Sequence, residues 1–268
     1  MLSPPVLGIA AARGPSTVHR TEESKGLSEG RRPLGGSTVL ARMEETRHRF
    51  HAALTELEQK ALDGFELVIE QLDRALDSVG SADVELAAAV VADDERINQL
   101  YREINEDALS LLARQTPVAG DLRLVAALLD IVRCIERMGD QCANIAKLVP
   151  LSGSETATDA AILATIERMG VLVRSQVSRA EQAFDARDVA VARDVVGRDG
   201  EVSRLDRQVF IRAVEVGSDL EVREWAMFMI LVARCLERIA ENTVNIAEQT
   251  VFVVIGLFRE SESASQLA

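Results

Sequence analysis

A segment of fourteen residues occurs twice in this chain, 101 residues apart. Residues 133–146 read RCIERMGDQCANIA and residues 234–247 read RCLERIAENTVNIA. An internal repeat with a period near one hundred residues indicates two copies of one small domain. Because both copies carry acidic and amide side chains at matching positions, we expect structure and chemistry to be duplicated together.

Proline and glycine set the first 42 residues apart from the rest. Four of the six prolines and six of the sixteen glycines lie there, a composition typical of disordered chain. We therefore expect residues 1–42 to form a disordered N-terminal extension, with Met43 as a candidate native start. The remainder is rich in Ala, Leu, Val, Glu and Arg, which favour long helices. We expect the body of the protein to be all-α.

Apolar residues recur at three- and four-residue spacing along six stretches of the body, as on one face of a helix. Three stretches fall within residues 43–150 and three within residues 151–258, which leaves residues 259–268 as a C-terminal tail. A bundle of about 100 residues can bury a core of its own, so the expected fold is two tandem three-helix bundles. The predicted helices are Glu44–Val79, Ala82–Arg114, Asp121–Val149, Thr158–Ala186, Val189–Val216 and Asp219–Phe258.

Charge and cysteine content narrow the class of function. Residues 1–42 carry six basic and three acidic side chains, which leaves 24 basic and 40 acidic ones, a net charge of −16, in the body. This balance argues against nucleic acid as a ligand. An odd number of cysteines without a secretory signal predicts reduced thiols and a cytoplasmic location. The apolar run Val251–Phe258 is too short to span a bilayer, so no membrane insertion is expected.

Each copy of the repeat places two carboxylates and an amide at four-residue spacing. In a helix such residues lie on one face, about 6 Å apart along the axis. Two carboxylates side by side near a buried face repel unless a cation joins them, and oxygen ligands suit Mg²⁺, Mn²⁺ or iron. These two carboxylate stripes are Glu136, Asp140 and Asn144 in the first copy and Glu237, Glu241 and Asn245 in the second.

Other interpretations of the repeated segment stay open. Arg133 or Arg137 can satisfy the first pair of acids as solvent-exposed salt bridges. Cys134 and Cys235 stand at equivalent positions, which admits a redox or thiolate–metal function. Because free cysteine commonly packs as a small apolar side chain, we predict a core role for both.

The repeated segment resembles the E-R-I-[GA]-D-x-x-x-N-I-A signature of the PhoU family, and residues 115–123, QTPVAGDLR, resemble the family's Q-x-P-V-A-x-D-L-R turn. The resemblance covers nearly everything from Met43 to Phe258. It implies two PhoU repeats, each a three-helix bundle, in a cytoplasmic protein that restrains phosphate uptake and phosphate-starvation signalling. The implied role is that of a non-catalytic adaptor, not an enzyme, recruited peripherally to the inner face of the membrane.

The resemblance also implies partners and ligands. The partners are the ATPase subunit of the high-affinity phosphate transporter (PstB-like) and a membrane sensor histidine kinase (PhoR-like), and a homodimer is expected. Some members bind iron, zinc, manganese or magnesium through paired acidic motifs on two helices of a repeat, and no organic cofactor is implied. The matching residues are Glu136, Asp140, Asp94 and Asn98 in the first repeat and Glu237, Glu241, Asp199 and Ser203 in the second.

This chain departs from the family pattern in ways that affect metal binding. Asn98 and Ser203 each replace a carboxylate, and Asn242 stands where many members have His. Fewer anionic ligands weaken a site for hard cations, above all in the second repeat. Two other functions remain open: an accessory protein of a low-affinity phosphate permease, and a carboxylate-bridged di-metal helical-bundle protein, although the Glu-x-x-His pairs of that last class are absent.

Overall fold

The computed structural model describes residues 36–114, 117, 119–152, 159–198, 200–217 and 219–256. The chain divides into two compact units, residues 1–43 and residues 44–268. The first helix begins at Gly36, so residues 36–42, expected as part of the disordered extension, are helical. The rest of that extension and the predicted tail at residues 259–268 lie outside the described residues.

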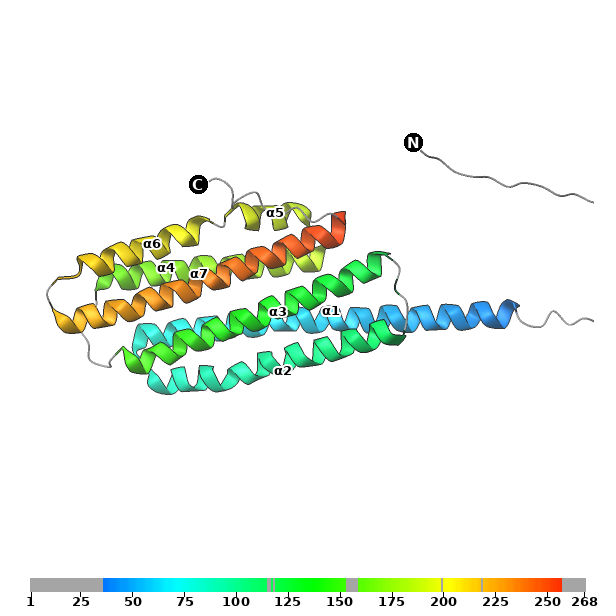
Figure 1. Ribbon diagram of the computed structural model, residues 1–268, viewed down its shortest axis with the longest axis horizontal. Coiled ribbons are helices and arrows are strands. Elements are labelled where there is room, and N and C mark those ends of the chain that lie inside the picture. Colours follow the sequence, from blue (N-terminus) through cyan, green and yellow to red (C-terminus); the bar gives the residue numbers. More distant parts are fainter. Residues whose placement is uncertain are drawn as a thin grey trace, which may run out of the picture. The chain divides into compact units, whose positions relative to one another are not determined.

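The first half of the body is three helices, as the periodicity predicts. They are α1 (Gly36–Ser81), α2 (Val84–Arg114) and α3 (Ala119–Leu148), followed by one short 3-10 turn, η1 (Val149–Leu151). Figure 1 shows α2 and α3 lying alongside the part of α1 drawn in cyan, and α2 packs directly on α3.

The second half differs from the prediction in its middle helix. It consists of α4 (Ala160–Ala186), α5 (Val189–Gly197), α6 (Gly200–Glu215) and α7 (Leu220–Ile255). One continuous helix over Val189–Val216 was expected, but α5 ends at Gly197 and α6 starts at Gly200. Two glycines three residues apart each cost about 1 kcal/mol of helix propensity relative to alanine, which weakens the helix at this point.

Aspartates begin four of the helices. The Asp83 carboxylate accepts a hydrogen bond from the backbone N–H of Leu86 at 2.8 Å. Asp159, Asp188 and Asp219 each accept from two backbone N–H groups at the first turns of α4, α5 and α7. Such caps satisfy donors that have no partner inside the helix.

The last helix ends at a glycine in the left-handed conformation. Gly256 has φ 79° and donates its N–H to the carbonyl of Phe252 at 2.8 Å. The predicted end at Phe258 lies outside the described residues. Although α7 finishes in an apolar run, none of the helices in the described part of the chain is both long and apolar enough to cross a membrane.

The two halves share one core instead of each burying its own. A single apolar cluster runs through buried side chains of all three helices of the first half and of α4, α6 and α7 in the second. The halves meet where α3 packs on α7, and there the Thr243 hydroxyl lies 3.5 Å from the Met138 sulfur. Each repeat therefore completes the core of the other.

Helices α1 and α4 form the second contact between the halves. Arg174 on α4 pairs with Asp73 on α1 at 3.0 Å, and Arg187, just after α4, pairs with Glu58 nearer the start of α1. Because later residues of α4 meet earlier residues of α1, the two helices run antiparallel. About one turn beyond the Arg174–Asp73 pair, Gly170 lies directly against Leu76, and a Cβ atom at Gly170 would collide with Leu76 Cδ1 unless the leucine side chain moved.

Arg187 is predicted to be the more important of these two arginines. Its guanidinium lies 4.4 Å from the centre of the Phe184 ring and donates to the Phe184 carbonyl as well as pairing with Glu58. Burial raises the pKa of Glu58, and Arg187 opposes that rise. Replacing Arg187 by alanine should lower the free energy of unfolding by about 1–2 kcal/mol, because it strands a partly buried carboxylate.

Arg174→Ala is the matched control for this variant. Its ion pair with Asp73 is more exposed, so its loss should cost about 0.5 kcal/mol or less. Arg187 has φ 53°, a conformation equally strained for alanine, so the backbone does not bias the comparison. Urea titrations of the two variants measure the difference, and equal stability losses would contradict the assignment.

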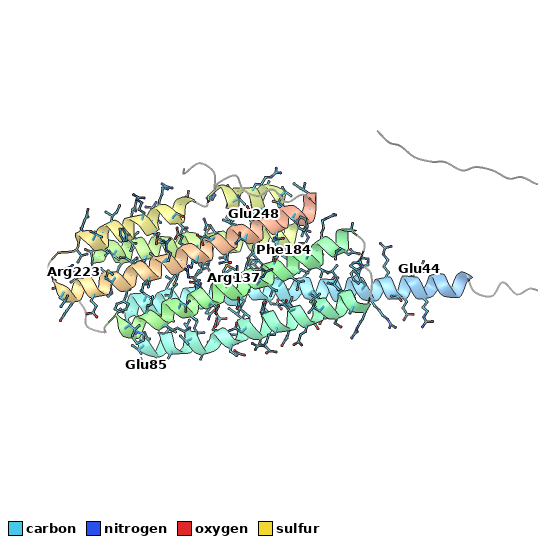
Figure 2. All side chains as sticks on the ribbon, viewed as in Figure 1. Glu44, Glu85, Arg137, Phe184, Arg223 and Glu248 are labelled. Atoms are coloured by element: carbon cyan, nitrogen blue, oxygen red, sulfur yellow. The ribbon has the colours of Figure 1, made fainter. Side chains whose placement is uncertain are left out.

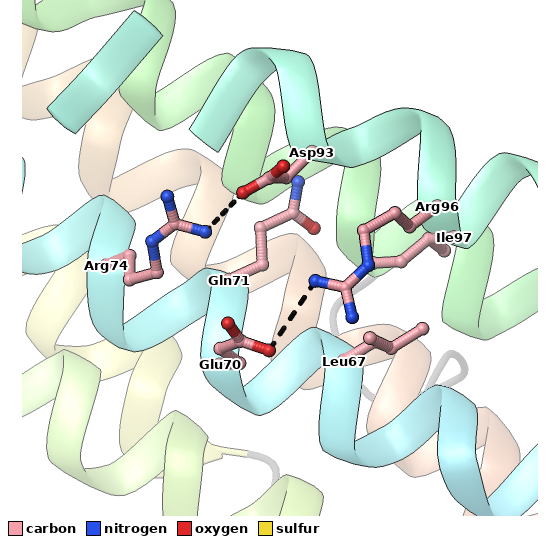
Figure 3. A pocket seen from close by; sticks show the side chains of 7 residues that line it. All are labelled: Leu67, Glu70, Gln71, Arg74, Asp93, Arg96 and Ile97. Atoms are coloured by element: carbon pink, nitrogen blue, oxygen red, sulfur yellow. Dashed lines mark hydrogen bonds and ion pairs between the residues drawn. The ribbon is translucent and has the colours of Figure 1, made fainter. Parts of the chain in front are cut away.

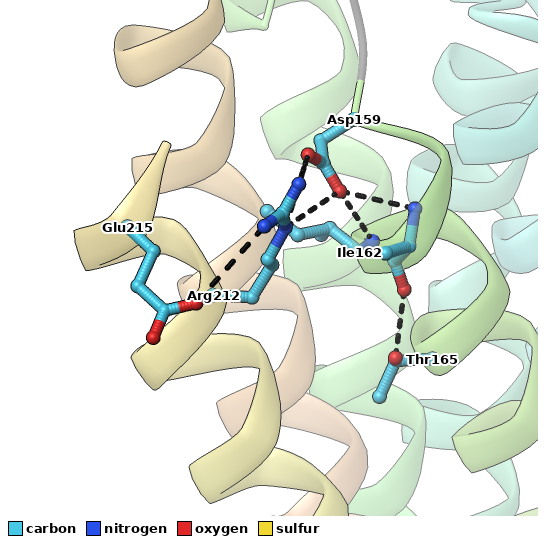
Figure 4. A network of polar contacts seen from close by, with 6 residues as sticks. Asp159, Ile162, Thr165, Arg212 and Glu215 are labelled. Carbon is cyan, nitrogen blue, oxygen red and sulfur yellow. Dashed lines mark hydrogen bonds and ion pairs between the residues drawn. The ribbon is translucent and has the colours of Figure 1, made fainter. Parts of the chain in front are cut away.

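A polar network joins the start of α4 to α6 (Figure 4). Arg212 donates from Nη2 to Asp159 Oδ2 at 2.7 Å and from Nε at 3.1 Å, while Asp159 also caps α4. The hydrogen bond from Arg212 is the main cause that lowers the pKa of Asp159. Asp159 therefore stays ionised to unusually low pH. Its contacts hold the start of α4 against α6.

Candidate carboxylate site

The first candidate site lies where α2 meets α3. Asp94 on α2 lies directly against Gly139 on α3: a Cβ atom at Gly139 would be 3.1 Å from Asp94 Oδ1 and 2.9 Å from Ile97 Cδ1. Gly139 separates Met138 from Asp140 in the repeated segment. The missing side chain is therefore what lets α2 approach closely enough to bring Asp94 beside the acids of α3.

Amide side chains hold Asp94 in place. Asn98 donates from Nδ2 to Asp94 Oδ2 at 3.1 Å, and the buried Gln71 on α1 donates from Nε2 to Asp94 Oδ1 at 3.4 Å. Gln71 also donates to the Val90 carbonyl at 3.2 Å. Asn98, which replaces a carboxylate of the family motif, therefore turns its amide group toward the remaining one.

Repulsion between carboxylates marks this site electrostatically. Burial raises the pKa of Glu136, and Asp140 and Asp94 raise it further, against an opposing effect of Arg137. Burial likewise raises the pKa of Asp140, and Asp94 adds to the rise. Asp94 thus lies close enough to Glu136 and Asp140 to disfavour the charge of both. A cation at this place would relieve that repulsion.

Arg133 and Arg137, which were predicted as alternative partners of the first-repeat acids, form no ion pair with Glu136 or Asp140 in the described part of the chain. Arg133 pairs with Asp130, one turn away on α3. Within the described ranges Glu136 and Asp140 form no ion pair. Their donors are all oxygen, which suits hard cations, but no three His, Cys, Asp or Glu side chains of the described residues are grouped as they are around a metal ion. The metal site remains a prediction.

The second candidate site has a different chemistry. Glu237 on α7 is buried and forms an ion pair with Arg234, and Arg234 also lies 3.6 Å from Asp206 on α6. Burial raises the pKa of Asp206, Glu237 raises it further, and Arg234 opposes the rise. In this repeat an arginine occupies the place where a cation would balance the acids.

The residues predicted for the second site are only partly brought together. Asp199 lies outside the described residues, in the break between α5 and α6. Ser203 on α6 and Glu241 on α7 are exposed. The acid that the sequence analysis missed is Asp206. It stands seven residues after Asp199, two helical turns further along the same predicted face, and this spacing is the signal that could have indicated it.

A second repeated feature lies between the first two helices of each half. Figure 3 shows Gln71 between the Arg74–Asp93 ion pair (2.5 Å) and the Arg96–Glu70 ion pair (3.8 Å). The second half repeats the arrangement with Gln176, also buried, and an Arg179–Asp194 pair at 2.5 Å. Both glutamines donate to a backbone carbonyl of the neighbouring chain segment. These pairs align the helices of each repeat.

The cysteines occupy apolar surroundings. Cys134 and Cys142 are buried and Cys235 is half-buried. Burial raises the pKa of Cys134 to about 11 and raises the pKa values of Cys142 and Cys235 as well. Thiolate formation is therefore disfavoured at all three, in agreement with the predicted core role of Cys134 and Cys235.

The fold and its duplicated acids define a helical protein made of two similar units with a common core, one of three helices and one in which the middle helix is divided into α5 and α6. The PhoU domain matches this chain twice, over residues 62–149 and 166–250, once in each repeat. The chain belongs to the PhoU family. The family resemblance and the all-α duplicated fold predicted from the sequence are thereby confirmed.

Individual relatives agree with this assignment. The phosphate-specific transport system accessory protein PhoU homolog of Clostridium acetobutylicum is 29% identical over 214 residues, which cover 79% of this chain and 96% of that one. The homolog of Caulobacter vibrioides is 34% identical over 187 residues, 69% of this chain and 81% of that one. The crystal structure of the phosphate transport system regulatory protein PhoU from Streptococcus pneumoniae superposes with a TM-score of 0.73 at 28% identity and covers 79% of this chain and all of that one.

Proposed function

We propose that this protein regulates phosphate transport as a non-catalytic adaptor. The observation that carries the proposal is the pair of PhoU domain matches, one in each repeat. Relatives similar along most of their own length are named accessory proteins of the phosphate-specific transport system. The raised pKa values of Cys134 and Cys235 argue against a nucleophilic role of these thiols.

The proposed partners are the ATPase subunit of the phosphate transporter and a sensor histidine kinase, met at the inner face of the membrane. An adaptor shifts a partner between states only by binding one state more tightly than the other. The long helices offer extended surface for this purpose, and a homodimer would present each surface twice. Copurification identifies the membrane partner: retention of a low-affinity phosphate permease instead would favour the accessory role for that class of transporter.

Deleting the gene should derepress phosphate-starvation genes when phosphate is abundant. Without the adaptor the kinase loses the signal that phosphate is sufficient. Transcript levels of a starvation-induced gene, measured in the deletion strain with and without a plasmid copy of the wild-type gene, test this. Unchanged repression in a strain that has no second copy would rule out the proposed role.

We also propose that the first-repeat carboxylates bind a divalent cation and that the second-repeat acids do not. Within the described residues Glu136 and Asp140 form no ion pair, and burial and the nearby Asp94 raise the pKa of each, whereas Arg234 already balances Glu237. Elemental analysis of tag-free protein, after incubation with manganese, iron, zinc or magnesium, should find metal that is lost in the Glu136→Ala/Asp140→Ala variant.

Glu237→Gln/Glu241→Gln is the matched control for the metal experiment. It removes the two equivalent carboxylates of the second repeat and should leave the metal content unchanged. Metal that disappears equally from both variants, or that survives in the first, would refute the assignment to the first repeat. If the wild-type protein holds no metal after any incubation, the proposal of a metal site is wrong, and the carboxylate stripe of the first repeat is only a polar surface.

A further inference from the structure

An apolar groove lies between α6 and α7 on the outside of the second repeat. Its lining includes Phe210 and Ile211 from α6 and Ile230 from α7, with Arg207 and Arg234 at its edges. Met227 stands three residues before Ile230, about one turn earlier on α7. Phe210 is 53% exposed and Met227 64% exposed. Side chains of this size and exposure, gathered along two adjoining helices, form a contiguous apolar surface of the kind that marks an interaction site.

The first repeat provides an internal comparison for this groove. Buried Val202 and Val209 of α6 correspond to buried Ile97 and Ile104 of α2, 105 residues earlier, and α7 corresponds to α3 with the 101-residue offset of the repeated segment. These two offsets give the first-repeat residue that is equivalent to each residue compared here. The pairs are Phe210 and Asn105, Ile211 and Glu106, Met227 and Ala126, and Leu231 and Asp130.

At these four positions the first repeat has polar or small residues where the second has large apolar ones, although Ile230 of the groove corresponds to Leu129, which is apolar as well. The helix packing does not require the apolar residues, because the first repeat does without them. Exposing them has a cost in solubility that a purely structural surface has no reason to carry.

We propose that this groove binds an amphipathic helix of a partner protein, with the apolar face of that helix buried and an acidic edge turned toward Arg207. Two helices packed side by side leave a trough that a third helix fills, as in helix-in-groove recognition. The inference rests on the proposed adaptor function, since an adaptor needs a docking surface, and it adds the chemistry of the segment that docks.

Charge selects the acidic edge. The charged residues of the lining are Arg207, Arg234 and Asp206. Arg234 is engaged by Asp206 and Glu237, but Arg207 has no ion-pair partner within the described residues. Arg223, labelled in Figure 2 near the start of α7, is followed by the acidic Glu224, so this pair of residues adds no net charge.

Charge also disfavours a second copy of this chain as the occupant. A symmetric dimer through the groove would place the same patch on both subunits. Such an interface would contain two copies of Arg207, and like charges at an interface are unfavourable. An acidic helix from another protein would not bring like charges together at the interface.

A titration of the full chain with synthetic peptides tests the proposal. The probe is a labelled peptide of about 18 residues, long enough to form a helix, with leucines at i, i+3, i+4 and i+7 spacing and glutamates along both edges. The comparison peptide carries lysine in place of every glutamate. Fluorescence anisotropy should show the acidic-edge peptide binding about tenfold more tightly than the basic-edge one.

Variants locate the binding in the groove. Phe210→Ser/Met227→Ser should weaken binding of the acidic-edge peptide about tenfold, and Arg207→Glu should reverse the preference between the peptides. Asn105→Ser/Ala126→Ser changes the equivalent positions of the first repeat and should leave binding unchanged. All these sites lie on the outside of the helices, and circular dichroism with thermal melting verifies that each variant folds.

Several outcomes would overturn the proposal. These are no binding by either peptide, equal binding of both, and binding that survives Phe210→Ser/Met227→Ser. If phosphatidylglycerol vesicles sediment the wild type but not that variant, while the peptides fail, the groove meets a lipid surface. If the variant abolishes self-association in sedimentation velocity while the peptides fail, the occupant is a second copy. Either result leaves the gene-deletion test of phosphate regulation unaffected.

Discussion

Replacing Arg234 by alanine is expected to lower the free energy of unfolding by about 2 kcal/mol at pH 7, because the change leaves two nearly buried acids without their cation. The side chains of Glu237 and Asp206 are only 12% and 17% exposed. Denaturant titration at pH 7 measures the loss. Adding Glu237→Gln to the variant should restore part of it, since one of the two stranded charges is then removed.

The equivalent arginine of the first repeat is the control. Arg133 pairs with Asp130 on the surface of α3, so Arg133→Ala should cost about 0.5 kcal/mol or less. Equal losses for Arg133→Ala and Arg234→Ala would show that the Arg234 pairs are worth no more than surface contacts, and would contradict the account of the second site.

The loss at Arg234 should depend on pH with a defined sign. Asp206 already has a pKa raised above its ordinary 3.8, so the folded state binds its proton more tightly than the unfolded state does. Stability then falls as the pH rises from the ordinary pKa through the folded one. Removing Arg234 raises the folded pKa further, so the deficit of the variant should be larger at pH 7 than at pH 4.

Replacing Gly139 by valine is the second change with a large expected effect. The new side chain would meet Ile97 and Asp94 at the contact between α2 and α3, and overpacking of this kind should cost about 2–3 kcal/mol. The same displacement moves Asp94 away from Glu136 and Asp140. Thermal melting and denaturant titration measure the first effect, and metal content, if the wild-type protein holds metal, reports the second.

Gly120→Val separates crowding from helix propensity. Gly120 lies in the same helix, α3, but a Cβ atom there has nothing within 4 Å. Valine is a better helix former than glycine, so this variant should be as stable as the wild type or slightly more so. A Gly139→Val variant as stable as Gly120→Val would mean that Ile97 turns aside freely and that close approach at Gly139 is not required.

The helices were predictable because each carries a periodic apolar face. Leu57, Phe65 and Leu72 are buried on α1 at the positions the spacing indicates, and the ends of α2 and α4 fall within two residues of the predicted ones. The break after Gly197 was missed because the apolar period continues across it, from Val195 to Val202. Periodicity identifies a buried face but does not report the local cost of two glycines.

The arrangement of candidate site residues could be predicted only within a single helix. Glu136 and Asp140 share a face of α3, and four-residue spacing fixes that without knowledge of the fold. Whether Arg133 turns to Asp130 or to Glu136 depends on rotamers, and the pairing of Arg234 with Asp206 depends on which turn of α6 faces α7. The shared core was missed for the same reason. The spacing of apolar residues shows that a helix face is buried, but it does not show which other helix packs against that face.

The contact between Met138 and Thr243 spans 105 residues of chain, and this separation has a consequence for biosynthesis. A ribosome adds about 5–20 residues per second, so the inner face of α3 leaves the ribosome on the order of 5–20 s before the part of α7 that covers it. During that interval the first repeat is complete in sequence but has an uncovered apolar side. A nascent chain of this protein is therefore a candidate client for chaperones that bind apolar surface until translation ends.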